Sequence, residues 1–142
     1  MIDGIFSSEI YQILEKSLSA ASMQHKMVAN NIANAETPGY KRSEVVFQNK
    51  LAEILDDSAK NYLPLNITNS RHIPIMPNMN ISDLEPEIVT RTETSLRTDK
   101  NNVDIDSEMS KLAENTASYS TLARLTSLKL GMLKTAITEG RR

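Results

Sequence analysis

Two long segments of the 142-residue chain repeat apolar or small side chains at alternating spacings of three and four residues. Such a heptad pattern is typical of helices that pack lengthwise against other helices. The first segment runs from about residue 8 to residue 35. Its stripe consists of Tyr11, Leu14, Leu18, Ala21, His25, Val28, Ile32 and Ala35. His25 is its polar member, which we interpret as an interruption that fixes the register of the helix.

The second stripe is longer and lies between about residues 104 and 138. It consists of Ile105, Met109, Leu112, Thr116, Tyr119, Ala123, Thr126, Leu130, Leu133 and Ile137. Asp104 is placed to cap the start of this helix, and acidic residues suit its first turn. A second apolar set accompanies the stripe, namely Leu122, Leu125, Met132 and Ala136. Because one partner helix covers only one stripe, the second set indicates a further neighbour.

The middle of the chain, about residues 43–100, has a different pattern. Residues 43–57 place Phe47, Leu51, Ile54 and Leu55 on one helical face, which predicts a short helix. Residues 61–86 contain four of the five prolines, so little regular structure is expected there. Residues 87–98 alternate β-branched and polar side chains, which predicts a strand or a short hairpin.

These elements predict a mainly α fold in which the long N- and C-terminal helices pair as an antiparallel coiled coil. A short helix and an irregular, β-containing segment lie between them. We expect one structural unit with three regions: residues 1–36, 37–103 and 104–142. A helix of roughly 25–30 residues is about 40 Å long. That length suits a subunit packed lengthwise among other subunits better than a compact domain.

Composition narrows the class of function. The chain is 39% hydrophobic but only 4% aromatic, which suits a helical assembly protein that shares its apolar stripes with neighbours. Its 16 basic and 18 acidic residues give a net charge of −2, so no nucleic-acid partner is expected. No apolar run approaches the ~18 residues that span a bilayer, and residues 1–16 lack the pattern of a secretory signal. We therefore expect no direct membrane insertion and no cleavable signal peptide.

The residues that carry most enzyme chemistry are scarce. The chain has no cysteine, and its two histidines are far apart, so neither a thiol nucleophile nor a zinc site is expected. Asp104, Asp106 and Glu108 resemble the start of a calcium loop. However, Met109 and Asn115 stand where such a loop needs glycine and glutamate, so an acidic helix start explains these residues better. The sequence predicts no enzyme activity, no metal and no cofactor.

The most distinctive stretch is ANNIANAETPGYKR, residues 29–42, at the end of the first helix. Three asparagines fall within five residues, and their amides can both donate and accept hydrogen bonds. They can satisfy carbonyls at the helix end, or bond the returning chain or a neighbouring subunit. A turn with proline and glycine then fixes the exit direction. We interpret these residues as a subunit-interface signature: Asn30, Asn31, Ile32, Asn34, Thr37, Pro38, Gly39 and Tyr40.

The stretch MVANNIANAETPGYKR closely resembles the signature of the flagellar rod, hook and hook-associated axial proteins. NNVDIDSEMSKLAENTASYSTL, LKLGMLKTAI, FQNKL and SRHIPI, together with the short length, are similar to the proximal rod branch of that family. The resemblance implies a structural subunit that polymerises helically around a central export channel, with its terminal helices in the inner wall. It implies a periplasmic place in the basal body, after passage through the flagellar type III export apparatus without signal cleavage. The implied partners are copies of itself, other rod and basal-body proteins, and that apparatus.

Two other interpretations stay open at this point. One is the sibling proximal rod protein of the same branch. The other belongs to a different class, a small helical export chaperone or adaptor that uses the same stripes to hold a client. Such a chaperone has no need of the Thr-Pro-Gly-Tyr turn.

Overall fold

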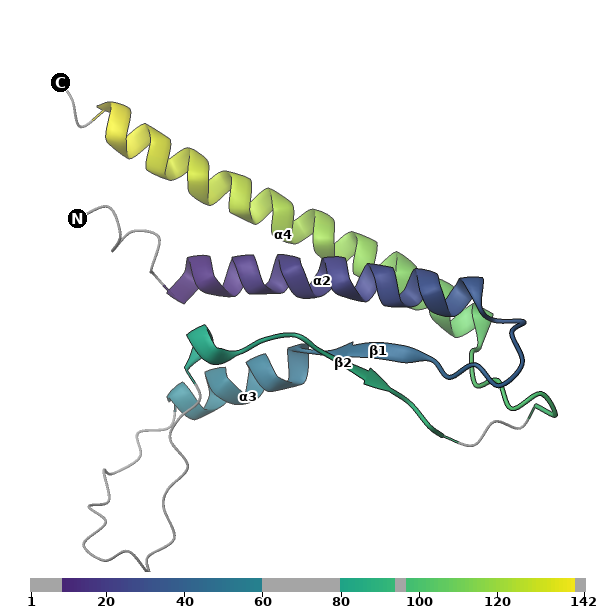
Figure 1. Ribbon diagram of the computed structural model, residues 1–142. Coiled ribbons are helices and arrows are strands. Elements are labelled where there is room, and N and C mark those ends of the chain that lie inside the picture. Colours follow the sequence, from purple (N-terminus) through teal and green to yellow (C-terminus); the bar gives the residue numbers. More distant parts are fainter. Residues whose placement is uncertain (1–8, 60–79, 94–96, 140–142) are drawn as a thin grey trace, which may run out of the picture.

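The computed structural model describes residues 9–59, 80–93 and 97–139 (Figure 1). It is mainly helical, as the pattern predicts. The elements, in order, are α2 (Glu9–Ala33), β1 (Ser43–Val46), α3 (Gln48–Ala59), the short 3-10 helix η1 (Ile81–Asp83), β2 (Glu87–Thr90) and α4 (Ile105–Glu139). None of the helices in these ranges combines the length and hydropathy that a bilayer-spanning segment needs.

Helix α2 is the central element of the molecule. Helix α4 runs along one side of it, and the middle segment of the chain lies along another (Figure 1). We call residues 43–59 and 80–93, which hold β1, α3, η1 and β2, the arm. The fold is therefore a long helix held between an antiparallel helix and a small mixed arm.

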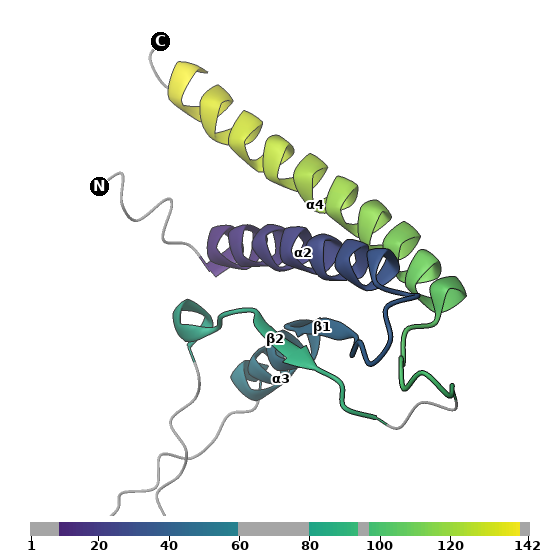
Figure 2. The same cartoon turned by 45° about the vertical axis from the view of Figure 1, so that its right-hand side comes forward.

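The predicted antiparallel pairing of the two terminal helices is confirmed. The Tyr11 hydroxyl donates to the carbonyl of Lys129 at 3.3 Å, near the start of α2 and late in α4. Midway, the Asn115 amide donates to the carbonyl of Ala21 at 3.0 Å. Figures 1 and 2 both show α4 drawing away from α2 toward its C-terminal end. The pair is thus closed where α2 ends and α4 begins, and open at the other end.

A small apolar core joins α2 to the arm. Its buried members are Ala20, Phe47, Ile54 and Leu84, and three half-buried residues pack against them, namely Val45, Leu51 and Ile81. The short helix of the arm is where the sequence predicts one, and three of its four expected core residues face this cluster. The fourth, Leu55, is 44% exposed. Lys16 adds a polar contact, because its ammonium donates to the carbonyls of Ser82 and Leu84 at 2.6 and 2.7 Å.

The short helix predicted within residues 43–57 is confirmed, but the first residues of that segment are not helical. Residues 43–46 form strand β1, and the helix starts only at Gln48. The side-chain oxygen of Gln24 accepts the Val45 N–H at 2.8 Å. Asn31 bonds both backbone groups of Ser43. Because side chains of α2 and the neighbouring strand take up these backbone groups, tertiary pairing overrides the local helical pattern.

A strand lies where the alternation of residues 87–98 predicts one, but it is not a local hairpin. Strand β2 pairs antiparallel with β1, with Ser43 opposite Thr90 and Val46 opposite Glu87. The Arg91 N–H donates to the carbonyl of Arg42 at 2.9 Å and continues the pairing by one step. Local alternation shows that a segment suits a sheet, yet it does not identify a partner more than forty residues upstream.

Helix α4 begins as the sequence predicts. The Asp104 carboxylate accepts the backbone N–H of Asp106 at 3.1 Å and, more weakly, that of Ser107 at 3.5 Å. This is the geometry of an N-cap, which satisfies donors that the first turn leaves unpaired. In the described ranges, His, Asp and Glu side chains nowhere gather in the groups of three that a metal site needs.

Candidate functional site

The closed end of the helix pair is held by buried polar side chains from three parts of the chain. We call the side chains of Asn31, Asn101, Asn102 and Glu108 the clasp. Asn31 belongs to the last turn of α2, Glu108 to the first turn of α4, and the two other asparagines to the segment that leads into α4. Asn31, Asn101 and Glu108 are each 1% exposed or less.

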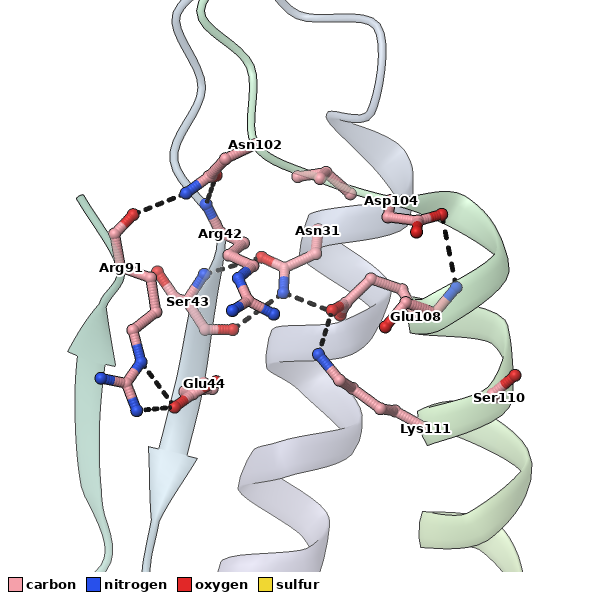
Figure 3. A network of polar contacts seen from close by, with 12 residues as sticks. Asn31, Arg42, Ser43, Glu44, Arg91, Asn102, Asp104, Glu108, Ser110 and Lys111 are labelled. Atoms are coloured by element: carbon pink, nitrogen blue, oxygen red, sulfur yellow. Dashed lines mark hydrogen bonds and ion pairs between the residues drawn. The ribbon is translucent and has the colours of Figure 1, made fainter. Parts of the chain in front are cut away.

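Asn31 connects α2 to three other segments, and Figure 3 shows its bonds to two of them, at Ser43 and Glu108. Its amide nitrogen donates to the Ser43 carbonyl at 2.8 Å and to the Glu108 carboxylate at 2.9 Å. Its amide oxygen accepts the Ser43 N–H at 3.0 Å and the Tyr40 hydroxyl at 3.3 Å. An asparagine side chain has two N–H donors and two acceptor lone pairs. Asn31 therefore uses its full bonding capacity inside its own chain.

Glu108 is a buried carboxylate whose two oxygens are both bonded. One oxygen accepts from Asn31, and the other accepts from the Lys111 ammonium at 2.7 Å (Figure 3). A buried charge is tolerated when it is paired and hydrogen-bonded in this way. Lys111 lies one turn further along α4, so the ion pair is local while the bond to Asn31 spans the two helices.

Asn101 caps the end of α2 from the segment that leads into α4. Its amide nitrogen lies 2.9–3.0 Å from the carbonyl oxygens of Asn34, Ala35 and Thr37. Its amide oxygen accepts the Val103 N–H at 2.7 Å. Carbonyls at the end of a helix lack partners within the helix. Here the segment before α4 supplies the partner, so each helix end helps to complete the other.

Asn102 fastens the end of the two-stranded sheet. Its amide oxygen accepts the Arg42 N–H at 2.8 Å, and its amide nitrogen donates to the Arg91 carbonyl at 2.8 Å (Figure 3). It thus bridges the residue before β1 and the residue after β2. The adjacent ion pair between Arg91 and Glu44 links the same two strands and raises the pKa of the Arg91 guanidinium.

The turn after α2 forms the tip of the closed end. Gly39 has φ of 75°, a conformation that residues with a Cβ rarely adopt. Its N–H donates to the carbonyl of Asp99 at 2.8 Å. The Asp99 carboxylate accepts the Asn101 N–H and pairs with Arg97, and these bonds, the first above all, lower the pKa of Asp99. The tip is thus tied to the segment that leads into α4.

The eight signature residues have two different environments. Asn31 is buried, while Ile32, Asn34 and Tyr40 are half-buried. The other four are exposed, namely Asn30, Thr37, Pro38 and Gly39. Asn34, directly after α2, donates to the carbonyl of Asn30 in the last turn of that helix at 2.8 Å, whereas Asn31 bonds the returning chain. Both roles that the sequence suggests for the asparagines therefore occur, each carried by a different residue.

The sequence interpretation missed Asn101 and Asn102 as members of the site. A signal for them exists in the printed sequence. Two adjacent asparagines stand just before the cap of the C-terminal helix, separated from it by Val103, and two adjacent asparagines also stand near the end of the N-terminal helix. Amide side chains near helix ends commonly bond backbone groups, so the second pair deserved the same interpretation as the first.

The N-terminal stripe lies mostly inside the described fold. Leu14 and Val28 are buried, and Leu18 and Ile32 are half-buried. The expectation for His25 as a polar interruption within the packed seam is wrong, because its side chain is exposed. It lines an open groove between α2 and α4 together with Tyr119.

The C-terminal stripe is largely uncovered. Leu112 and Leu133 are half-buried, but the exposed fractions of four other members are 51%, 45%, 47% and 70%, for Met109, Tyr119, Leu130 and Ile137 respectively. The face of α4 turned to α2 is more polar and includes Glu108, Lys111, Asn115, Ser118 and Leu122. At about 100° per residue, this face lies between the heptad stripe and the second apolar set. Leu125 and Met132 of that set are 46% and 63% exposed.

Two glycine replacements are expected to change stability in opposite directions. Gly39→Ala should lower the free energy of unfolding by about 1–2 kcal/mol, because alanine is strained at positive φ although the space beside Gly39 is open. Gly131→Ala should raise it by about 1 kcal/mol, because that position is helical and also open. Thermal denaturation followed by circular dichroism measures both. Equal shifts of the two melting temperatures contradict the assignment of a backbone constraint to Gly39.

Comparison with known proteins identifies the family. A family model described as flagella basal body rod protein matches residues 12–41, which include most of α2 and the signature turn. The flagellar basal body rod protein FlgB of Bacillus subtilis is 38% identical over 138 residues, which cover 97% of this chain and 99% of that protein. The chain belongs to the FlgB family of flagellar basal body rod proteins. The FlgB proteins of Borreliella burgdorferi and Proteus mirabilis are 33% and 31% identical over 72% and 84% of this chain, and the alignments cover 76% and 85% of those proteins.

Membership of the FlgB family decides between the alternatives left by the sequence. The chain is a structural subunit of the flagellar basal body rod and not an enzyme. Neither the sibling rod protein FlgC nor a cytoplasmic chaperone is favoured by these relatives. As a rod protein of the basal body, it assembles with other rod and basal-body proteins. The clasp is therefore a feature of a FlgB-type subunit, at the end of the helix that carries the family signature.

Proposed function

We propose that this chain polymerises helically, with copies of itself and neighbouring rod proteins, into the proximal segment of the rod. Helices α2 and α4 lie lengthwise in the wall around the export channel, and the arm projects from α2. Residues 1–36, 37–103 and 104–142 act as one unit, because the clasp joins the last turn of α2, the start of the arm and the first turn of α4. We place the subunit in the periplasmic part of the basal body, where it arrives through the flagellar type III export apparatus.

The observation that carries the polymerisation proposal is the exposure of the heptad stripe on α4. A stripe with this spacing fits the surface of another helix. Helix α2 does not cover the stripe, because it contacts the neighbouring face of α4. Large contiguous apolar surfaces on a soluble protein mark sites of association. The second apolar set on the other side of the contact face offers a further surface, as a subunit with neighbours on two sides requires.

The exposed part of the signature provides a third surface under this proposal. Asn30, Thr37, Pro38 and Gly39 lie at the tip of the closed end, while the bonds of Asn31 hold the tip in shape from inside. The signature thus combines a buried frame and an exposed contact. The frame stabilises the subunit itself, and the contact serves the next subunit.

A charge on the stripe should block assembly without unfolding the subunit. Leu130 is 47% exposed in the free chain, so Leu130→Asp should change the free energy of unfolding by less than about 1 kcal/mol. In the rod, the same carboxylate would be buried without a partner, at a cost of several kcal/mol. We therefore expect normal export, lost motility and few complete rods. Secretion assays, swimming assays and counts of purified basal bodies measure the three quantities.

Ala113→Asp is the matched control for this prediction. Residue 113 is also exposed on α4, but it lies away from the stripe and from the face that contacts α2. A strain with Ala113→Asp should swim and assemble rods. Normal swimming by the Leu130→Asp strain, or equal loss in both strains, contradicts the stripe as the assembly surface.

A further inference from the structure

The two-stranded sheet of the arm has one closed edge and one open edge. At the outer edge of β1, Gln24 accepts the Val45 N–H at 2.8 Å. Asn31 accepts the Ser43 N–H at 3.0 Å and donates to the Ser43 carbonyl at 2.8 Å. Two side chains of α2, one heptad apart, therefore take the place of a third strand along β1.

The register of the sheet fixes the direction of the backbone groups at the other edge. In an antiparallel pair, opposite residues either bond each other or both point away from each other. Ser43 and Val45 point toward α2, so their opposite residues, Thr90 and Ile88, point away from β1. Within the described ranges, no residue outside the sheet bonds the backbone N–H or carbonyl of these two residues.

Apart from its shortness and the charge of Glu87, the edge of β2 has none of the usual protection of a free strand. Natural proteins blunt such edges with proline, lysine, a bulge or a covering element. Strand β2 has the sequence Glu-Ile-Val-Thr, with neither proline nor lysine, and its pairing with β1 is regular. Ile88 is 48% exposed on it. The sheet is held to α2 along the edge of β1, so a third strand beside β2 would add hydrogen bonds at its other edge.

The charge along this edge indicates what binds there. The exposed acidic side chains between the start of η1 and residue 93 are Asp83, Glu85, Glu87 and Glu93, and Arg91 is the single basic residue in that range. The side chains of Glu87 and Glu93 are 59% and 66% exposed even though each has a basic partner. An extended segment that carries lysine or arginine beside a β-branched or aromatic residue complements this edge.

We propose that β2 accepts such a basic, extended segment of a different basal-body protein as the third strand of the sheet. A second copy of the chain does not fit as well. Of its described strands, β1 is already bonded along both edges, and β2 is itself acidic. That the donor is a basal-body protein rests on the proposed function, whereas the open edge is a property of the chain alone.

Thr90→Pro tests the edge directly. Proline removes the N–H that points away from β1 and leaves the ladder between the strands intact, and edge positions tolerate it. Thr90→Val is the matched control, because it loses the same hydroxyl contact to Ser43 but keeps the N–H. The two purified variants should melt alike. The Thr90→Pro strain should yield few complete rods, and the Thr90→Val strain should yield normal numbers.

Hydrogen exchange tests the same edge without any substitution. The amide hydrogens of Ile88 and Thr90 should exchange at least ~10-fold more slowly in purified basal bodies than in the isolated chain, as amides do when they enter a ladder. A cryo-EM map of these basal bodies should show a strand of another protein beside β2. Unchanged exchange, a helix over the edge or a strand from a second copy overturns the inference, as do normal rods in the Thr90→Pro strain. If the chain is missing from the basal bodies altogether, the proposed function fails instead.

Discussion

Asn31→Ala is expected to lower the free energy of unfolding of the isolated chain by about 3–5 kcal/mol. The replacement removes four hydrogen bonds at once. It also leaves the buried carboxylate of Glu108 with only its bond to Lys111, and it leaves both backbone groups of Ser43 without their partner on α2. Chemical denaturation followed by circular dichroism measures the loss, and motility of the corresponding strain should be abolished.

The neighbouring asparagine provides the control for this prediction. Asn30 is exposed, so Asn30→Ala should change the free energy of unfolding by less than about 0.5 kcal/mol. Asn31→Asp keeps the shape of the side chain but brings a second carboxylate against Glu108. Asn31→Asp should lower the free energy of unfolding at least as much as Asn31→Ala does. If Asn31→Ala unfolds at the same denaturant concentration as Asn30→Ala, the clasp does not stabilise the subunit.

Asn101→Ala is expected to lower the free energy of unfolding by about 2–4 kcal/mol. The side chain is fully buried, and it caps three carbonyls at the end of α2 as well as the Val103 N–H. Because these bonds join the end of α2 to the segment that leads into α4, the loss should appear in both terminal helices. Hydrogen exchange near residues 30–35 should quicken together with that near residues 103–110.

A charge at the same position sharpens the test. Asn101→Asp has nearly the same shape but no N–H to donate, and its carboxylate would face the carbonyl end of the α2 dipole. We expect it to be more destabilising than Asn101→Ala. A matched pair in which the aspartate variant is the more stable one would falsify the capping role of the amide.

The terminal helices were predictable from sequence because their stripes are local and long. Asp104 indicates the start of α4, because an aspartate is a common N-cap. The proline and glycine after Thr37 indicate the end of α2. The strand β1 was not predictable, because its conformation is set by Gln24 and Asn31, which lie on another element. Of the proline-rich segment 61–86, residues 61–79 lie outside the described ranges, so the expectation of little regular structure there stays a prediction.

The site was only half visible in the sequence for a related reason. Asn31 belongs to a distinctive sequence signature. Its partners Ser43 and Glu108 stand in no such motif, so the sequence does not identify them as members of the site. The sequence also did not reveal which face of α4 packs against α2. Periodicity identifies an apolar stripe, yet it does not say whether the stripe meets the same chain or another one. Here the more polar neighbouring face meets α2, and the stripe is left for association.

The way in which α2 holds the arm has a consequence for sequence change over evolutionary time. The side chains of Lys16, Gln24 and Asn31 bond main-chain carbonyl and N–H groups of the arm, which every amino acid except proline provides. Substitutions on the outer surface of the arm therefore leave its attachment intact, while substitutions at these three positions of α2 do not. Selection can then remodel the arm to suit changing neighbours and still preserve the helical frame beneath it.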